Sequence, residues 1–523
     1  MNIMTALQQI DALMKERRLA EAGDLAALLA EKHPTNPDGW RRLGRVHEAS
    51  GNFGAMLTSF QKVVELVEED LHAHLKVAQA LIQQGELKAA TDELARLRAL
   101  AWGDSYLLMH IGQLYTHLAV FDLAYDCFKR SVALAPKDTQ ALYNLATAAT
   151  AVGDLDEAVA LYDQVIALKP SDYDAYYNRA TLRKWTADNN HINDMEALLK
   201  SGIPDMKGAV QLFYALAKEY EDLGDAGASF AHLRRGADLR ASMMAYHVST
   251  DTGAMADIER VFSADFFKGG VSTSDAPGPI FIVGLPRTGT TLVDRILSSH
   301  SSVDSLGEIH DFAQSLMRLA GPASNKTDLI EKSAALDFEA LGEAYLTSTA
   351  ARGQAGPYLV DKTPANFLYL GLIARAMPTA RIIHLQRGAM DSCFAIYKTL
   401  FRLGYPYSYR LEDLADYFIA YRKLMAHWHA VLPGRILDVS YESLVAELDG
   451  QTRRMLDHCG LPFEDACLTF HENKSASATA SAAQVRQPLY ASSVGRWKDH
   501  AEALASLKAR LEAAGVTTEG GAK

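Results

Sequence analysis

The sequence predicts an array of paired helices followed by an α/β domain with a parallel sheet, and two observations support this fold class. In the first half, small residues recur at 34-residue intervals, a spacing typical of repeated helical hairpins. In the second half, an apolar run leads into a loop with two glycines and then into a helical pattern, the order of a buried strand, an anion-binding turn and a helix. The 523 residues also exceed what a single core normally supports.

The 34-residue register is set by Gly51, Gly85 and Gly153, with Ala119 at the intermediate position. Three further sets keep it: Leu43, Val77, Ile111 and Leu145; Phe60, Leu94, Phe128 and Tyr162; and Pro34, Pro136 and Pro170. This matches the tetratricopeptide-repeat template, in which helices cross closely at a small residue and an aromatic ring fills the groove beside the next pair. Each pair alone leaves an apolar face uncovered, so about five pairs are expected to stack.

The array is expected over residues 5–245, with regular pairs to about residue 170 and looser copies after that. A connecting helix and a linker are expected over residues 246–278, because the chain becomes rich in Gly, Pro and Ser there. The second domain is then expected over residues 279–515.

The composition excludes several classes of function. A formal net charge of −12 argues against general nucleic-acid binding, which needs a broad basic surface. The four cysteines show no CxxC spacing and no Cys/His cluster, so no metal site is expected. The first residues lack the apolar core of a secretory signal, and no apolar run approaches the roughly 20 residues of a membrane helix. A cytoplasmic protein without a membrane span is therefore expected.

The segment Gly284-Leu-Pro-Arg-Thr-Gly-Thr-Thr291 follows the apolar run Ile280–Val283 and precedes a helical pattern. Backbone N–H groups of such a loop, together with the positive end of the helix, converge on an anion. The spacing is that of a Walker A loop, except that Thr290 stands where a nucleoside-triphosphate site has its lysine. Arg287 must then supply the positive charge, which is sufficient for a sulfuryl group because it carries one negative charge fewer than a terminal phosphoryl group.

On these residues the chain resembles the sulfotransferases that use 3′-phosphoadenosine-5′-phosphosulfate (PAPS), whose 5′-phosphosulfate loop reads much like Pro286-Arg-Thr-Gly-Thr-Thr291. The resemblance covers residues 279–500 and points to bacterial tetratricopeptide-repeat sulfotransferase fusions and, more distantly, to tyrosylprotein sulfotransferases. It implies a P-loop-like α/β domain, PAPS as the donor without a metal ion, and these donor contacts in the loop: Pro286, Arg287, Thr288, Gly289, Thr290 and Thr291.

Arg387 follows a second apolar strand and therefore lies in the crevice where parallel sheets bind ligands. The resemblance implies that Arg387 binds the 3′-phosphate. Many of these enzymes have a serine eight residues later, a position that Ala395 takes here. Ser392, about one helical turn earlier on a similar face, is the candidate replacement.

The resemblance assigns roles to residues farther along the chain. Lys362, after another predicted strand, resembles the lysine that contacts the bridging oxygen and the sulfuryl group. The other counterparts are Tyr441 near the nucleotide, Ser481 at the sulfuryl group, and Gln484, Val485 and Arg496 in a segment that wraps the cofactor. Without the resemblance, that segment would be a polar loop and nothing more.

Glu308 and His310 are the candidate bases for removing a proton from an acceptor hydroxyl. Glu308 follows a glycine, as does the catalytic glutamate of the tyrosylprotein enzymes, and is our choice. His310 is the rival, because small-molecule sulfotransferases use a histidine. The resemblance then implies in-line transfer, in which donors stabilise charge on the sulfuryl and bridging oxygens: Arg287, Lys362 and Ser481.

Two other functions remain open. A P-loop kinase or NTPase would share the order of strand, loop and helix, although the Walker lysine and a strand that ends in a Mg²⁺-binding aspartate are missing. A peptide-binding repeat scaffold with a degenerate enzyme domain is the second. Ala395 fits this alternative, whereas four intact site residues argue against it: Arg287, Glu308, Lys362 and Arg387. The acceptor is open as well: a protein or peptide tyrosine, a saccharide, a lipid or a small phenol. A macromolecular acceptor would be captured by the repeat array.

Overall fold

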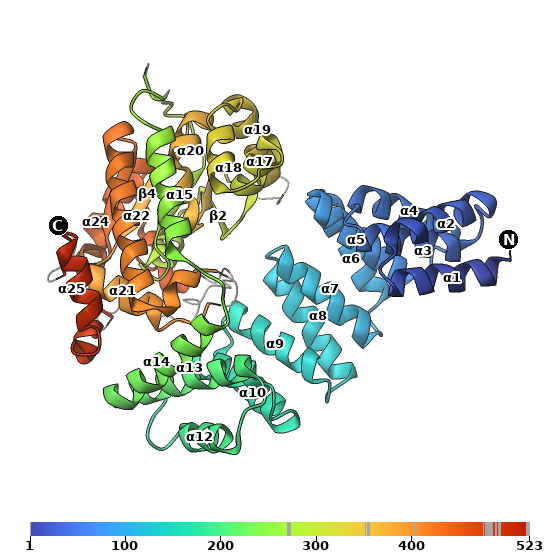
Figure 1. Cartoon of the computed structure of the whole chain (residues 1–523), viewed down its shortest axis with the longest axis horizontal. Helices are drawn as coiled ribbons and strands as arrows, with labels where there is room; N and C mark the ends of the chain where they lie inside the picture. The colour runs from blue at the N-terminus through green and yellow to red at the C-terminus, as the bar shows by residue number, and fades with distance from the viewer. Residues whose placement is uncertain are drawn as a thin grey trace. The chain divides into compact units, whose positions relative to one another are not determined.

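The computed structural model describes residues 2–268, 273–350, 352, 356–401, 404–473, 475, 485–486, 489 and 493–518 (Figure 1). Its packing divides the chain into two compact units, the first formed mainly by residues 1–164 and the second by the remainder. No helix among the described residues is both long enough and apolar enough to span a membrane.

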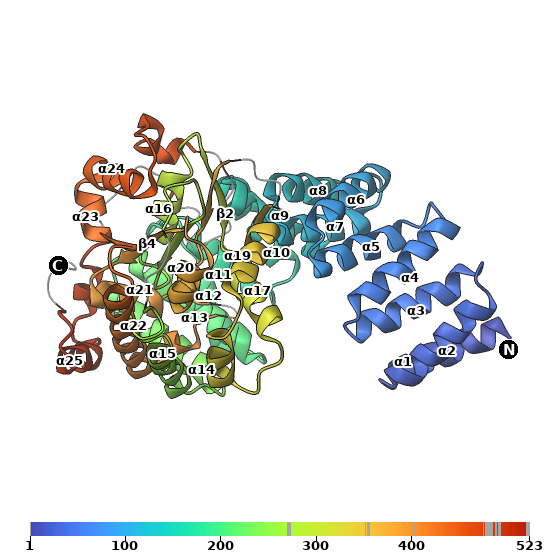
Figure 2. The same ribbon diagram turned by 90° about the horizontal axis from the view of Figure 1, so that it is seen from above.

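The first unit is a series of helical hairpins (Figure 2). Each helix from α1 to α8 packs against its successor, and α1, α5 and α7 also contact the next helix but one. This confirms the predicted array of paired helices. The helices are α1 (Ile3–Lys15), α2 (Leu19–Lys32), α3 (Pro37–Ala49), α4 (Phe53–Leu66), α5 (Leu71–Gln84), α6 (Leu87–Leu100), α7 (Ser105–His117), α8 (Phe121–Leu134), α9 (Thr139–Val152) and α10 (Leu155–Leu168).

The glycines of the 34-residue register lie at the ends of helices and not at the close helix crossings. Gly51 and Gly85 have φ angles of 70° and 81°, and a Cβ atom on either would meet no atom within 4 Å. They are therefore needed for the left-handed turn after a helix. The close helix crossing lies at Gly44, where a Cβ atom would come within 2.6 Å of the Phe60 ring. The aromatic residue of the register thus fills the space left by a different glycine.

The second unit contains a five-stranded parallel sheet in the order β2-β3-β1-β4-β5. This confirms the predicted α/β fold, and it brings the carboxyl ends of all five strands to one edge of the sheet. The strands are β1 (Ile280–Gly284), β2 (Val303–Gly307), β3 (Tyr358–Asp361), β4 (Arg381–Gln386) and β5 (Ile436–Ser440).

Helices pack on both faces of the sheet, and β1 is buried throughout. Ile280 and Ile282 face a core with α16 and α24, whereas Phe281 and Val283 face a core with α20 and α22. The helices of this unit are α11 (Tyr173–Thr181), α12 (Ile192–Ser201), α13 (Met206–Asp222), α14 (Ala226–Ser242), α15 (Val248–Val261), α16 (Thr290–Leu297), α17 (Asp311–Ala320), α18 (Lys326–Ser333), α19 (Phe338–Ala350), η1 (Pro364–Tyr369), α20 (Leu370–Ala376), α21 (Ala389–Tyr397), η2 (Pro406–Tyr409), α22 (Leu411–Val431), α23 (Tyr441–Ala446), α24 (Leu448–Cys459), η3 (Asp465–Cys467), η4 (Phe470–Glu472), η5 (Arg496–His500) and α25 (Ala505–Ala513).

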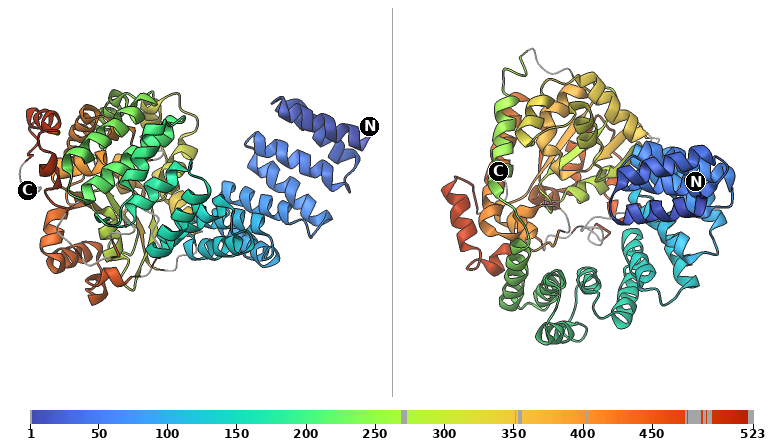
Figure 3. Two further views of the ribbon diagram at one scale, coloured as in Figure 1. Left: turned by 90° about the horizontal axis from the view of Figure 1, so that it is seen from below. Right: turned by 45° about the vertical axis from the view of Figure 1, so that its right-hand side comes forward.

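Helices α11 to α15 precede the sheet in the chain but belong to the same compact unit as the sheet (Figure 3). Helix α15 contacts α18 and α22, and α14 contacts η2 and η5. Tyr214, Phe230 and Phe262 are buried in the same core as Phe281 of β1. The predicted boundaries at residues 245 and 279 follow composition, whereas the packing joins the helices from Val165 onward to the sheet.

Candidate functional site

The loop after β1 has the form of an anion-binding helix start. Gly289 is the N-cap of α16, and no side chain caps the helix. Arg287 has a φ of 65°, which is uncommon for a residue with a side chain and is concentrated at functional turns. The hydroxyl of Thr288 donates to the carbonyl of Leu285 at 2.7 Å and closes the turn. The remaining predicted loop residues are all buried: Pro286, Thr290 and Thr291.

Close contacts require both glycines of this loop. A Cβ atom on Gly284 would lie 2.7 Å from the carbonyl oxygen of Leu385 in β4. One on Gly289, whose φ is 106°, would lie 2.6 Å from Cδ2 of Tyr441. The structure thus brings together Gly289 and Tyr441, two residues that the sequence predicted as donor contacts.

Arg387 directly follows β4, at the edge of the sheet that carries the loop. Its guanidinium donates to the carbonyl of Arg287 at 3.1 Å and to that of Ser493 at 2.5 Å. Its central carbon lies 4.9 Å from the ring centre of Tyr441, whose hydroxyl is bonded to that of Ser493 at 2.7 Å. Nε of Arg387 is buried, and no described residue bonds it. A buried N–H without an acceptor is an open position for an anionic oxygen.

Ser392 supports the backbone of Arg387. Its hydroxyl donates to the carbonyl of Arg387 at 3.1 Å, and its side chain is almost fully buried. Ala395, at the position where many of the similar enzymes have a serine, is also buried. A direct bond from Ser392 to a 3′-phosphate therefore stays a prediction.

Glu308 and Lys362 meet although 54 positions separate them in the sequence. Glu308 follows β2, and Lys362 follows β3, the neighbouring strand. The ammonium group of Lys362, which is 0 % exposed, donates a hydrogen bond to Glu308, which is 45 % exposed. Because β3 also pairs with β1, Lys362 lies between the predicted base and the anion loop. His310, the rival base, is the exposed N-cap residue of α17.

Asp294 of α16 lies near this pair and was not singled out from the sequence. Its carboxylate accepts a hydrogen bond from the hydroxyl of Ser305 at 2.6 Å, and that hydroxyl accepts one from the N–H of Gly307 at 3.1 Å. Burial raises the pKa of Asp294, and the positive charge of Lys362 opposes this shift. These bonds tie the helix after the anion loop to the strand end that carries Glu308. The sequence does contain a signal for Asp294, because it is an acidic residue within the apolar pattern of a helix.

Only some of the predicted PAPS contacts near the C-terminal end are among the residues that the structure describes. Ser481 and Gln484 are outside them, whereas Val485 is described and buried. Arg496 begins η5, and its guanidinium donates to Glu221 of α13 at 3.2 Å.

His384, His429 and Asp438 form the group most suited to a metal ion among the described residues. Nδ1 of His384 and Nε2 of His429 lie 2.7 and 3.1 Å from the same oxygen of Asp438, and Nε2 of His384 is bonded to the Tyr421 hydroxyl. Both nitrogens of His384 are thus already satisfied by protein groups. The sequence did not indicate this group, because its members come from β4, α22 and β5.

A cavity of about 670 Å³ adjoins Gly388, the residue after Arg387. It is also lined by Asp391 and Glu442, which accept hydrogen bonds from the N–H groups of Gly495 and Gly388 at 2.7 and 2.8 Å. The second oxygen of Asp391 is buried and bonded by no described residue. The volume is in the range of small-molecule sites, but Arg387 and the anion loop are not among the residues that line this cavity.

The model of the Sulfotransferase family matches residues 279–465, the stretch that holds the sheet, the anion loop, Glu308, Lys362 and Arg387. Residues 279–465 form a sulfotransferase domain. This match begins one residue before β1.

Several proteins are similar to a part of this chain. An uncharacterized protein of Aquifex aeolicus is 35 % identical over 231 residues, 42 % of this chain and 30 % of that protein. A putative protein-tyrosine sulfotransferase of Caenorhabditis briggsae is 27 % identical over 232 residues, 42 % of this chain and 80 % of that protein. The protein-tyrosine sulfotransferase of Drosophila melanogaster is 24 % identical over 231 residues, 42 % of this chain and 46 % of that protein. The match thus spans less than half of the Aquifex and Drosophila proteins.

The tetratricopeptide-repeat model matches residues 41–105, 121–173 and 143–182. The chain therefore joins tetratricopeptide repeats to a sulfotransferase domain. Among solved structures, MamA from Desulfovibrio magneticus RS-1 is 18 % identical and covers 32 % of this chain and 96 % of its own, with a TM-score of 0.29.

Proposed function

We propose that the protein transfers a sulfuryl group from PAPS to a hydroxyl acceptor. The observation that carries the proposal is the pair formed by Glu308 and Lys362, which follow two neighbouring strands of the sheet beside the anion loop. A base on the acceptor side and a cation next to the transferred group are what this transfer needs.

The residues around the loop fit an anionic nucleotide donor. The loop provides a helix start without a capping side chain, and Arg387 offers a buried N–H that no described residue accepts. A cation stacked on an aromatic ring, as Arg387 is on Tyr441, is also held in one orientation for its ligand. When bound, PAPS supplies the sulfuryl group and a phosphate leaving group.

The placement of these residues supports an in-line transfer. Glu308 accepts the proton of the acceptor hydroxyl while the hydroxyl oxygen forms its bond to sulfur. The bond between sulfur and the bridging oxygen breaks, and its electron pair leaves with adenosine 3′,5′-bisphosphate. Lys362, directed by β3 between the loop and Glu308, stabilises the charge that develops on the bridging oxygen. Ser481 is proposed to do the same for the sulfuryl oxygens.

For the acceptor we propose a tyrosine hydroxyl of a protein or peptide, captured in part by the repeat array. Relatives that are named protein-tyrosine sulfotransferases align with 42 % of this chain at 24 to 27 % identity. A different acceptor class is suggested by an omega-hydroxy-beta-dihydromenaquinone-9 sulfotransferase of Mycobacterium tuberculosis, which is 31 % identical over 111 residues, 20 % of this chain and 29 % of that protein.

Ligand binding tests the donor, and labelled PAPS tests the acceptor. We expect adenosine 3′,5′-bisphosphate to bind in the presence of EDTA and to raise the melting temperature by mass action. Equal or greater stabilisation by Mg-ATP would favour a kinase or NTPase instead. With labelled PAPS, label should enter a tyrosine peptide and not its phenylalanine counterpart. Label in a saccharide or a prenyl lipid alone would refute the proposed acceptor and retain the chemistry.

A further inference from the structure

We infer that Glu221, on α13 of the helical hairpins before the sheet, is a positioning residue for the donor site because it holds Lys398 and Arg496 in place there. The inference rests on the proposed function. It extends the predicted donor site, since neither Glu221 nor Lys398 was singled out from the sequence.

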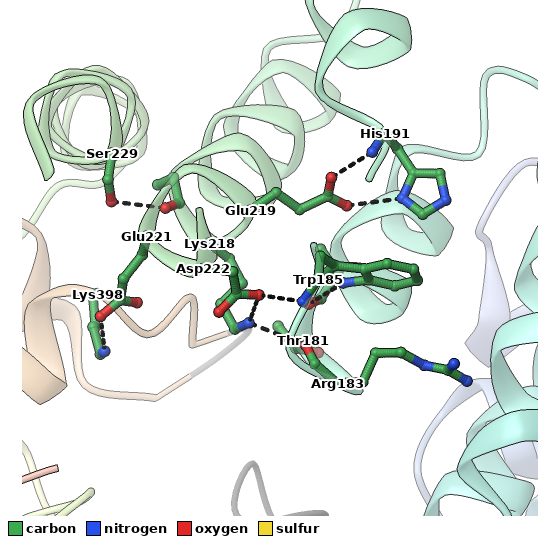
Figure 4. A network of polar contacts seen from close by, with 12 residues as sticks. Thr181, Arg183, Trp185, His191, Lys218, Glu219, Glu221, Asp222, Ser229 and Lys398 are labelled. Atoms are coloured by element: carbon green, nitrogen blue, oxygen red, sulfur yellow. Dashed lines mark hydrogen bonds and ion pairs between the residues drawn. The ribbon is translucent and has the colours of Figure 1, made fainter. Parts of the chain in front are cut away.

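One carboxylate oxygen of Glu221 accepts hydrogen bonds from both cations. Nζ of Lys398 lies 2.7 Å from this oxygen, and Nη2 of Arg496 lies 3.2 Å from it. The Glu221 side chain is 13 % exposed, whereas those of Lys398 and Arg496 are 33 % and 43 % exposed. The carboxylate is thus the inner member of the group. In Figure 4 it points toward Lys398, away from the neighbouring contacts of the same helix.

Both cations belong to segments that already form the donor site. Lys398 ends α21, the helix that begins two residues after Arg387. Arg496 lies three residues after Ser493, whose carbonyl accepts a hydrogen bond from Arg387. Burial lowers the pKa of Lys398, Glu221 opposes this shift, and the positive charges of Arg496 and Arg287 lower the pKa further. Arg287, the cation of the anion loop, therefore lowers the pKa of Lys398 in the same way as Arg496 does.

The helical hairpins hold the chain on both sides of Lys398. The hydroxyl of Tyr214 on α13 donates to the carbonyl of Tyr397 at 3.3 Å. The N–H of Leu400 donates to the hydroxyl of Tyr177 on α11 at 3.2 Å. The position of Lys398 is therefore set by α11 and α13 as well as by its own helix, and Glu221 fixes the remaining freedom of its long side chain.

The group formed by Glu221, Lys398 and Arg496 differs from an ordinary ion pair in its charge balance. Glu221 faces two cations, whereas Asp222, the next residue, binds the single cation Lys218 and the N–H of Trp185 (Figure 4). Two partly enclosed cations on one carboxylate leave an excess of positive charge, which an anionic donor would neutralise. Glu221 thus orients the two cations without fully neutralising them.

The test is donor binding by a charge-neutral variant of nearly the same shape. Glu221→Gln should weaken the binding of adenosine 3′,5′-bisphosphate in calorimetry by about tenfold, because two charge-assisted bonds lose their ionic partner. The KM for PAPS should rise in parallel, while kcat at saturating PAPS changes little. Glu221→Asp should recover part of the affinity. Asp222→Asn is the matched control, since it removes a buried charge from the same helix on the side away from Lys398, and its donor affinity should equal that of the unmodified protein.

A second variant keeps the inference testable if Glu221→Gln does not fold. Arg496→Gln alters a side chain that is 43 % exposed and should also weaken donor binding. In the double variant the two losses should add only in part, because both variants remove the bond between Glu221 and Arg496 and only Glu221→Gln also removes the bond to Lys398. Unchanged donor affinity in a folded Glu221→Gln protein would overturn the inference. If the unmodified protein itself fails to bind the bisphosphate, the proposed function fails instead.

Discussion

The buried ammonium group of Lys362 donates a hydrogen bond to the partly exposed carboxylate of Glu308, so the sheet joins the predicted base to the residue predicted to contact the sulfuryl group. The two residues follow adjacent strands, and the register of these strands fixes their separation. The contact also explains how a glutamate on an exposed loop keeps one orientation before an acceptor arrives.

Replacement of the base is expected to affect turnover and spare donor binding. Glu308→Gln retains the shape and removes the basicity, so kcat should fall by about 10²–10⁴-fold, the usual range for loss of a general base. The affinity for adenosine 3′,5′-bisphosphate should change little, because Glu308 is assigned to the acceptor side. Steady-state kinetics with labelled PAPS and calorimetry measure the two effects separately.

Two variants serve as controls for that measurement. His310→Ala should remain close to the unmodified protein in kcat. If it abolishes turnover while Glu308→Gln stays active, the base is His310. Arg387→Ala should show the opposite pattern, with donor affinity reduced by about 1.5–3 kcal/mol, the range for a hydrogen bond to a charged group. All variants should retain their melting temperatures to within a few degrees.

A methyl group on the loop glycine should disturb both the loop and Tyr441. In Gly289→Ala the new Cβ would lie 2.6 Å from the Tyr441 ring, on a backbone whose φ is 106°. We expect a loss of stability of about 1–3 kcal/mol and at least a tenfold loss of donor affinity. Gly450→Ala is the matched control, because a Cβ atom there meets nothing within 4 Å. Equal donor affinity of the two variants would show that the contact with Tyr441 has no part in binding.

The packing of the second unit predicts where the chain can be shortened. A chain that starts at residue 271 loses Tyr214, Phe230 and Phe262, all of which are buried in the core of the sheet domain. Each loss costs about 3–5 kcal/mol, so together they exceed the usual stability margin of a domain. We expect residues 271–523 to fail to fold and residues 165–523 to fold and bind adenosine 3′,5′-bisphosphate. Cooperative melting of the shorter chain would contradict the assignment of α11 to α15 to this unit.

The contact between His429 and Asp438 should make part of the stability depend on pH. The hydrogen bond to Asp438 raises the pKa of His429. Burial alone would raise the pKa of Asp438, but its bonds to His384 and His429 hold this pKa well below its usual range. Since a raised histidine pKa stabilises the fold below the ordinary value of about 6.5, the contribution is lost as the pH rises through the higher value of the folded state.

Denaturant unfolding of the unmodified protein and of His429→Gln measures this contribution. The unmodified protein should be the more stable of the two at pH 6, and its advantage should shrink by pH 8. An advantage that is equal at both pH values would show that the contact acts through packing and not through charge.

The local patterns of the sequence determined the architecture. A 34-residue register specifies stacked hairpins, and an apolar run before Gly284 specifies a buried strand that opens into an anion loop, because both depend on neighbours along the chain. The sequence also placed Arg387 in the ligand-binding crevice of the sheet. Arg387 follows an apolar strand, and the carboxyl end of any parallel strand faces that crevice. The roles of Glu308 and Lys362 came from the resemblance, and their contact came from the structure.

Only the tertiary structure decided which distant residues support the site. Glu221 and Lys398 are 177 positions apart and meet because α13 packs against the end of α21. Tyr441 lies on Gly289 because α23 begins at the carboxyl end of β5, on the edge of the sheet that carries the loop. The salt bridge between Glu221 and Lys398 leaves no periodic signal in the sequence. Strand order and helix packing, not spacing along the chain, determine which residues meet in such a contact.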